Sequence, residues 1–316
     1  MFTPDPTDLV AEYLFETPTD SGVIRNTANP GTLDGMIQHD PDAHPLAPSA
    51  DVPPGFVGSA SLNYNVLRRL SDSGESPQMS FAQYVEVPNF PDLANLTVET
   101  WVKVDYIKAN PAFTDPPQGT YPDGEVGFGA CPQPICKGFS WYLFLSTLQT
   151  DRNLILTIIP NNVTQGLPKE ADETSGSGGV VSEDIIHGGQ WTHLAATFGE
   201  VAPGRFIMQT YINGIQSHIE EVRDFNGNIR RIPNQTDNPI APSPGRPLRL
   251  GQFREIQGDL DYQYSGLLAG VRIYSRALTQ EQIQADYRHD ICSGTGPLGK
   301  EIFRLGLLSL WLLKST

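Results

Sequence analysis

Three pairs of acidic residues have a spacing that could support glycoside hydrolysis: Asp40 and Asp42, Glu170 and Asp172, and Asp259 and Asp261. That chemistry uses two carboxylates, about 5–5.5 Å apart for retention or 6.5–9.5 Å for inversion. Alternate residues of a strand lie roughly 6.6 Å apart on one face. None of these pairs lies inside an alternating strand pattern, because the first two occupy Pro- or Gly-rich stretches and the third precedes the apolar run at Gly266. The sequence therefore weighs against a hydrolase.

A polysaccharide lyase would need a base and a cationic group to neutralise the uronate of its substrate. His193 with Arg205 or Lys103 could supply such a set, but the sequence shows no cluster of Arg, Gln, His and Tyr around them. We interpret His193 as a structural residue that packs beside Trp191. The sequence leans against an enzyme, and a hydrolase or lyase stays the alternative.

Aromatic rings next to acids are typical of sugar recognition, since a ring can stack on a sugar face while polar groups bind its hydroxyls. Tyr262 and Tyr264, beside Asp259 and Asp261, form the most compact mixture of this kind. A second candidate pair, Trp141 and Tyr142, follows the cysteine loop described below. These six residues are the predicted ligand-binding residues, and the alternative is that the rings anchor long loops to the core.

Oxygen-bearing side chains gather after the first apolar segment, where Asp20, Asn26 and Asp34 follow one another closely. Ca²⁺ takes six to eight oxygen ligands from carboxylates, amides and carbonyls. These three residues are the predicted ligands of a structural calcium ion. The alternative is turn chemistry, in which Asp and Asn accept local backbone hydrogen bonds.

The three cysteines give evidence about the cellular compartment in which the protein works. Cys131 and Cys136 enclose four residues, two of them prolines, and no His or second Cys pair lies nearby to complete a zinc site. We predict a disulfide between them, with two separate thiols as the alternative. This weakly favours an extracellular or cell-surface location, and residues 1–8 contain neither a basic cluster nor an apolar run of the signal-peptide type.

The elements that must position these residues are short strands. Alternation is strictest over residues 96–104, where Leu96, Val98 and Val102 share one side and Glu99 and Trp101 the other. Asn-Gly at 213–214 predicts a tight hairpin. One short helix is expected, with Thr279 as N-cap and Gln282 in the capping-box position, ending before Asp290. Many strands with one helix predict an all-β fold, a two-sheet antiparallel jelly-roll sandwich with an apolar tail.

Several segments, in this order, resemble the laminin-G-like, concanavalin A-like jelly-roll domains of the lectin/glucanase superfamily. They are residues 9–16, 20–22, 34–35, 84–87, 96–103 (LTVETWVK), 191–195 (WTHLA), 211–214 (YING), 248–251 and 266–279. The resemblance implies two face-to-face sheets with the first and last strands adjacent, and a calcium in the first loop that is completed by an acid in the last strand. Here Ala269 and Gly270 stand where that acid is usual, and Asp259 or Asp261 could substitute.

The net charge of the chain limits the classes of partner that it can bind. The chain has 36 acidic and 21 basic residues, a net charge of −15, so it does not have the Lys and Arg excess that nucleic-acid binding requires. We expect a neutral glycan or a protein partner and no nucleic acid. The function that follows is a non-catalytic, lectin-like extracellular recognition module, with a structural subunit of a surface assembly as a third possibility.

The predicted domain spans residues 1–293, followed by a linker and an apolar tail at 294–316. The longest apolar stretch, residues 305–313, is too short for the roughly 20 residues that cross a bilayer, so no transmembrane span is predicted. The tail could be a helix that docks on a protein, a membrane-surface anchor or a non-native extension. We favour docking, which predicts self-association through the tail.

Overall fold

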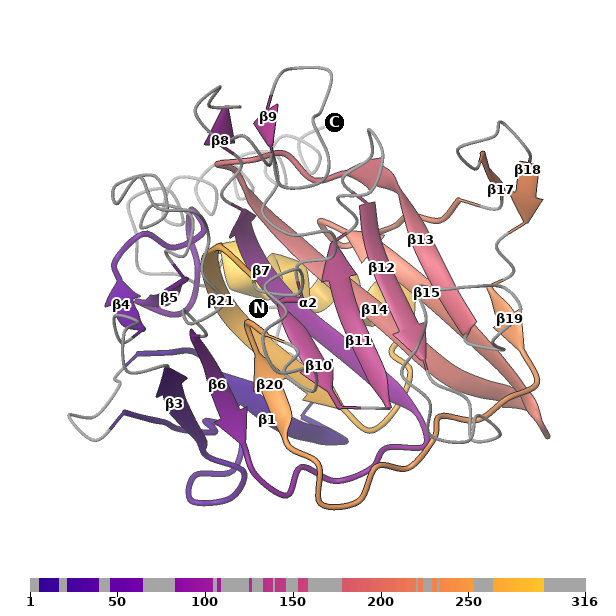
Figure 1. The fold of residues 1–316 in the computed structure, drawn as a ribbon, viewed down its shortest axis with the longest axis horizontal. Helices are drawn as coiled ribbons and strands as arrows, with labels where there is room; N and C mark the ends of the chain where they lie inside the picture. Colours follow the sequence, from indigo (N-terminus) through magenta and orange to yellow (C-terminus); the bar gives the residue numbers. More distant parts are fainter. Residues whose placement is uncertain are drawn as a thin grey trace, which may run out of the picture.

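The computed structural model describes residues 6–16, 22–39, 46–64, 83–104, 107–108, 125–126, 133–138, 140–145, 153–158, 178–219, 221–223, 229–231, 234–252 and 264–292. Within these ranges the chain forms two stacked antiparallel sheets and one α-helix, α2 (Gln280–Cys292) (Figure 1). The predicted jelly-roll sandwich with a helix near the C-terminus is confirmed.

The larger sheet has nine strands. Its order is β16 (Ile215–Gln216), β15 (Arg205–Ile212), β14 (Trp191–Ala202), β7 (Leu96–Val104), β21 (Gly266–Tyr274), β5 (Ser61–Tyr64) and β4 (Ala47–Ser49), while β1 (Leu9–Tyr13) also pairs with β21 and β19 (Gln235–Thr236) pairs with β15. Thus β21 is a central strand, with β7 along one side and both β5 and β1 along the other. The first and last strands are adjacent, as expected.

The smaller sheet has eight strands. Its order is β13 (Gly178–Ile185), β12 (Asn153–Ile158), β11 (Trp141–Leu145), β10 (Ile135–Lys137), β20 (Leu248–Leu250), β6 (Gln83–Val87), β3 (Gly35–His39) and β2 (Val23–Ile24). Two short ribbons pair β17 (Glu221–Arg223) with β18 (Ile229–Arg231) and β8 (Ile107–Lys108) with β9 (Glu125–Val126).

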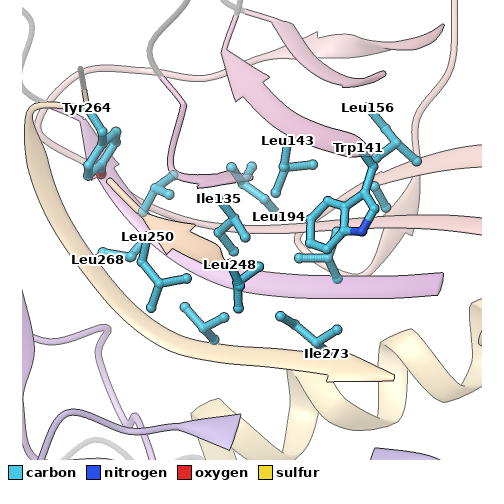
Figure 2. Packing of buried hydrophobic residues seen from close by; sticks show 14 of the residues in the cluster. Ile135, Trp141, Leu143, Leu156, Leu194, Leu248, Leu250, Tyr264, Leu268 and Ile273 are labelled. Carbon is cyan, nitrogen blue, oxygen red and sulfur yellow. The ribbon is translucent and has the colours of Figure 1, made fainter. Parts of the chain in front are cut away.

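The main core fills the space between the sheets. Ile135, Leu143 and Leu248 from the smaller sheet and Leu194, Leu268 and Ile273 from the larger one are all 0% exposed and belong to one cluster (Figure 2). Successive residues of a strand point to opposite faces, so the alternate residues of the larger sheet face outward. There Leu278, just before α2, and Ile283 of α2 pack against Ala195, Tyr211 and Tyr274.

Local sequence signals explain the turn of the β15–β16 hairpin and the start of the helix. Asn213 and Gly214, between β15 and β16, have φ of 52° and 77°, the left-handed pair that a type I′ turn requires. The Thr279 N–H donates to Gln282 Oε1 at 3.0 Å and the Gln282 N–H to Thr279 Oγ1 at 3.4 Å, so the capping box forms as predicted.

The predicted end of the helix was wrong. α2 continues through Asp290 to Cys292, because Asp286 and Asp290 are bound by buried partners on the sheet. The apolar tail at 294–316 lies outside the described residues.

Candidate functional site

The fold brings five titratable residues together between the larger sheet and α2. Glu99 on β7, His193 on β14 and Arg272 on β21 lie on the outer face of the sheet, and Asp286 and Asp290 lie one turn apart on the helix. All five are at most 2% exposed. We call this group the helix acid cluster.

Arg272 and Asp290 form the centre of the cluster. Arg272 Nη2 donates to Asp290 Oδ1 at 2.6 Å and Nη1 to Oδ2 at 3.1 Å, a bidentate pair, while Nε donates to Glu12 Oε1 at 2.8 Å. Trp101 Nε1 also donates to Asp290 Oδ2 at 2.8 Å. These charge-assisted bonds connect β1, β7, β21 and α2.

Asp286 is bound separately. The hydroxyl of Tyr274 donates to Asp286 Oδ2 at 2.7 Å. Burial raises the pKa of the Asp286 carboxyl and is partly offset by the Tyr274 bond and the Arg272 charge. The helix is therefore held to the sheet by polar side chains as well as by Leu278 and Ile283.

Glu99 is the exceptional member of the cluster. Neither of its carboxyl oxygens has a hydrogen-bond partner among the described residues. Burial, followed by the nearby acids Asp286 and Asp290, raises its pKa well above the usual range, and Arg272 counteracts this in part. These surroundings favour the protonated form of Glu99.

His193 lies next to Glu99, and its burial favours the neutral imidazole. Its Nε2 lies 3.9 Å from Glu99 Oε2, too far for a hydrogen bond. Burial lowers its pKa to about 4 against the opposing effect of Asp290. Its ring packs edge-on against Trp101 at 5.2 Å and near Tyr287 at 5.6 Å, so its aromatic neighbours come from β7 and α2.

The helix acid cluster holds the acids that glycoside hydrolysis would require, but it seals them from solvent. A glycosidic bond cannot reach side chains that are covered on one side by a sheet and on the other by a helix. Sequence reasoning placed Glu99 on the side of its strand opposite Leu96 and Val98, and it missed Asp286 and Asp290. Their i, i+4 spacing in a helix with few apolar residues was the available signal.

A second polar group lies on the outer face of the smaller sheet. Strand register sets Tyr142, Cys136, Arg249, Glu86 and Met36 in one row across β11, β10, β20, β6 and β3. Tyr142 and Cys136 are 5% and 1% exposed, the side chains of Arg249 and Glu86 are 17% and 31% exposed, and Met36 is 47% exposed. The row therefore opens to solvent towards β3.

The open end of this row and the next cross-strand pair on the same face form the Arg249 patch, which we define as Met36, Gln38, Tyr84, Glu86 and Arg249. Gln38 pairs with Tyr84 two register positions along from Met36 and Glu86. Arg249 donates to Glu86 Oε2 from Nε at 3.2 Å and from Nη2 at 3.1 Å. Its guanidinium carbon also lies 5.2 Å from the centre of the Tyr84 ring, in cation–π geometry. The patch thus combines a donor, an acceptor and an aromatic ring.

The predicted ligand-binding residues do not meet in one place. Tyr264 is 0% exposed, its hydroxyl donates to the Leu267 carbonyl at 2.8 Å, and its ring lies 5.6 Å from that of Tyr64. Trp141 is 1% exposed in the core between the sheets. The structure thus corrects both assignments: these rings pack the interior, the alternative role stated above. Tyr142 is buried at the closed end of the row, and Asp259, Asp261 and Tyr262 lie outside the described residues.

The residues predicted to bind calcium are engaged locally where they are described. Asn26 Oδ1 accepts the backbone N–H groups of Glu12 at 3.0 Å and Ala28 at 3.1 Å. Its Nδ2 donates to the carbonyls of Val10 and Thr32, and its own N–H donates to Asp34 Oδ1. Both lone pairs of the amide oxygen are used, so Asn26 does not fit as a calcium ligand.

Asp20 lies outside the described residues, so a calcium ion at Asp20 and Asp34 stays a prediction. Within the ranges that the structure describes, no group of three or more His, Cys, Asp or Glu side chains could hold a metal ion.

The predicted disulfide also stays a prediction, because Cys131 lies outside the described part of the chain. Cys136 is buried, and its Sγ lies 3.4 Å from the carbonyl oxygen of Gln252. Among the described helices, none is long and apolar enough to cross a membrane.

Comparison with known proteins gives one family. The family model of the concanavalin A-like lectin/glucanases superfamily matches residues 79–284. A search of curated proteins found no match.

Three solved structures are among those that match the chain. One is domain 4 of AbnA, a GH43 extracellular arabinanase from Geobacillus stearothermophilus, in complex with arabinotriose (17% identity, TM-score 0.48, 89% of this chain and 98% of that one). Another is the receptor binding domain of botulinum neurotoxin type G (11%, 0.48, 89% and 51%). The third is the binding domain of botulinum neurotoxin DC in complex with rat synaptotagmin II (10%, 0.48, 90% and 52%). The chain thus spans about half the length of the neurotoxin domains.

Proposed function

The chain belongs to the concanavalin A-like lectin/glucanase superfamily, and from this premise we propose that it is a non-catalytic recognition module that binds a glycan. Fold alone does not decide between binding and catalysis in such a scaffold, so the proposal depends on the residues at the surface. We place the module outside the cell or on its surface, in agreement with the disulfide expected at Cys131 and Cys136.

The observation that carries the proposal is the Arg249 patch. It is partly open to solvent, in contrast to the sealed helix acid cluster. Glu86 offers a carboxylate whose side chain is 31% exposed, Arg249 places its guanidinium over the buried Tyr84 ring, and Met36 offers exposed apolar surface. Sites that bind small ligands combine apolar surface with a few convergent polar groups in this way.

Hydrolysis is the runner-up and has weaker support. The acids that the described fold brings together, Glu99, Asp286 and Asp290, are buried at 2% exposure or less. Arg272 and Tyr274 already hold the two aspartates. The arrangement supports an anchoring role for these acids.

A glycan array probed with the full chain, with and without EDTA, tests the proposal. We expect binding to at least one glycan, and a loss of about tenfold or more, ~1.4 kcal/mol, in Arg249→Ala and in Tyr84→Ala. Arg288→Ala, an exposed arginine on α2, is the matched control and should bind normally. Absence of glycan binding, or an equal loss in Arg288→Ala, would reject the proposal. The comparison with EDTA also tests the predicted calcium.

A further inference from the structure

We propose that α2 is a pH-sensitive latch on the larger sheet, docked while Glu99 carries a proton and released as Glu99 ionises. The latch lies in the helix acid cluster, on the outer face of the larger sheet, whereas the Arg249 patch belongs to the smaller sheet. The release of α2 is therefore independent of the proposed function.

The attachment of α2 to the sheet depends strongly on charge. A helix usually docks on a soluble domain through an apolar face. The buried residues of α2 are Ile283, Asp286 and Asp290, so acids outnumber apolar side chains among them. Arg272 binds Asp290, and Tyr274 binds Asp286. The free energy of docking thus depends on whether the two aspartates keep these partners.

Glu99 lies beside the cation that holds Asp290. Arg272 on β21 is the cross-strand partner of Glu99 on β7 and of Glu12 on β1. Both Nη atoms of Arg272 donate to Asp290 and its Nε donates to Glu12, while Glu99 receives no hydrogen bond from a described residue. An ionised Glu99 would therefore compete with Asp290 for Arg272.

Titratable or charged groups surround Glu99 on every element packed around it. They are His193 on β14, Arg272 and Tyr274 on β21, Glu12 on β1, and Asp286 and Asp290 on α2. Burial, and after it the two aspartates of α2, raises the pKa of Glu99, and Arg272 opposes this. Loss of the Glu99 proton would add a negative charge that faces the two aspartates, so ionisation favours departure of the helix.

The release of α2 would leave the sandwich in place. α2 is the last described element, and both sheets are paired without it. A helix of 13 residues is marginal by itself, so it should lose its backbone hydrogen bonds when it leaves. Elements with few buried apolar contacts open at lower free energy than a core. Release would uncover Trp101, whose indole N–H donates to Asp290 in the docked state.

Hydrogen exchange followed by mass spectrometry, on the full chain from pH 5 to pH 9, tests the latch. Protection factors are compared, because they remove the intrinsic pH dependence of exchange. We expect a lower protection factor in α2 than in β7 at each pH, since the helix opens while the sheets stay folded. The protection factor of α2 should fall by up to about tenfold per pH unit, because opening releases the Glu99 proton.

Glu99→Gln keeps the shape of the side chain and cannot ionise, so the protection of α2 should no longer depend on pH. Histidine and cysteine side chains also titrate in this range. The double variant His289→Gln with Cys292→Ser, in the last turn of α2, should therefore keep the pH dependence of the wild type. Glu183→Gln, at an exposed acid on β13, should keep it too.

Three results would overturn the proposal. Equal protection of α2 and β7 at every pH would mean that the helix opens only when the whole domain unfolds. Protection of α2 that does not change with pH in the wild type would remove the switch. A pH dependence that survives in Glu99→Gln would reject the role of Glu99. Should Glu99→Gln not fold, Asp286→Asn decides: the pH dependence should survive in it, because burial is the main cause of the raised pKa of Glu99.

Discussion

Arg272 is a fully buried cation whose removal would leave two acids without their main partner. In Arg272→Met, Asp290 and Glu12 lose the bonds of 2.6–3.1 Å described above. Breaking a buried ion pair costs about 3–5 kcal/mol, because the remaining charge stays buried. Urea unfolding at pH 7 should show this loss. Lys103→Met, which removes the exposed pair with Asp51, should cost about 0–1 kcal/mol. Equal losses in the two variants would contradict this account.

Glu99 should make the protein less stable as the pH rises. Its pKa in the folded state lies above the unfolded value, so folding binds a proton. The stabilising contribution is complete below the unfolded pKa and is lost as the pH rises through the folded pKa. Glu99→Gln keeps an uncharged side chain at every pH. The variant should therefore gain free energy of unfolding over the wild type as the pH increases from 5 to 9.

This difference is measured by urea unfolding at several pH values. Glu183→Gln, which changes an exposed residue of β13, should follow the wild type. A constant difference between Glu99→Gln and the wild type across this range would show that the pKa of Glu99 is not raised by folding.

For single residues, the sequence predicts which face of a strand a side chain occupies, but it does not predict which distant residue that side chain contacts. The alternation of residues 96–104 correctly placed Glu99 and Trp101 on the side away from Leu96 and Val98. Asp290, which binds Trp101, lies 189 positions further along the chain. Nothing local to either residue encodes that contact, because it depends on how α2 sits on the sheet.

Among the elements, the turn between β2 and β3 depends on one side chain. Asn26 makes four hydrogen bonds to backbone groups of residues 10, 12, 28 and 32. Asn26→Ala should cost about 2–4 kcal/mol, because buried donors and acceptors would lose their partners. Thermal unfolding should show the same loss with calcium and with EDTA. Asn29→Ala, exposed in the same turn, is the control and should be near neutral. A loss that disappears in EDTA would indicate a metal ligand.

Gly270 permits the bulge in β21. The register against β7 shifts between Ala269 and Arg272, and Gly270 has φ of +56°. A Cβ there would lie 2.7 Å from the Phe56 ring. Gly270→Ala should therefore cost about 2–4 kcal/mol, from strain and overpacking together.

Gly204→Ala isolates the contribution of the backbone. Gly204 has φ of +71°, and a Cβ added there would meet no atom within 4 Å, so its substitution should cost only about 1 kcal/mol. Equal losses at both sites, measured by urea unfolding, would show that the Phe56 contact is unimportant.

The start of α2 could be predicted from its own sequence, but its end could not. Thr279 and Gln282 indicated its start, because capping is a local interaction. Its end was missed because Asp286 and Asp290 resemble a solvated polar surface until their partners on β21 and β7 are known. The same limit affected the ligand residues: Tyr264 looks like a surface ring, yet it packs on Tyr64, 200 positions away.

For the whole molecule, the sandwich should fold without the apolar tail. All described elements end by Cys292. Truncation after Gly296 should leave the melting temperature unchanged and abolish self-association. Nine large apolar residues between Ile302 and Leu313 would each gain roughly 1.5–3 kcal/mol on burial, which favours association of the full chain.

Sedimentation of the full-length and truncated proteins is the measurement. A full-length variant with Leu308→Asp and Leu312→Asp is the control and should behave like the truncated protein. Identical monomers in all three cases would remove the proposed role. Unfolding of the truncated protein would place the tail in the core.

The central position of β21 has a consequence for synthesis. The nine-stranded sheet needs residues 266–274 to join β7 with β1 and β5. Until the ribosome has released that segment, β1 has no partner in the sheet and one edge of β7 stays unpaired. Exposed edges of this kind promote aggregation, and contacts between distant residues form slowly. The nascent chain must therefore stay soluble with an open sheet until nearly the whole domain has been made, a period in which chaperones have their longest access to it.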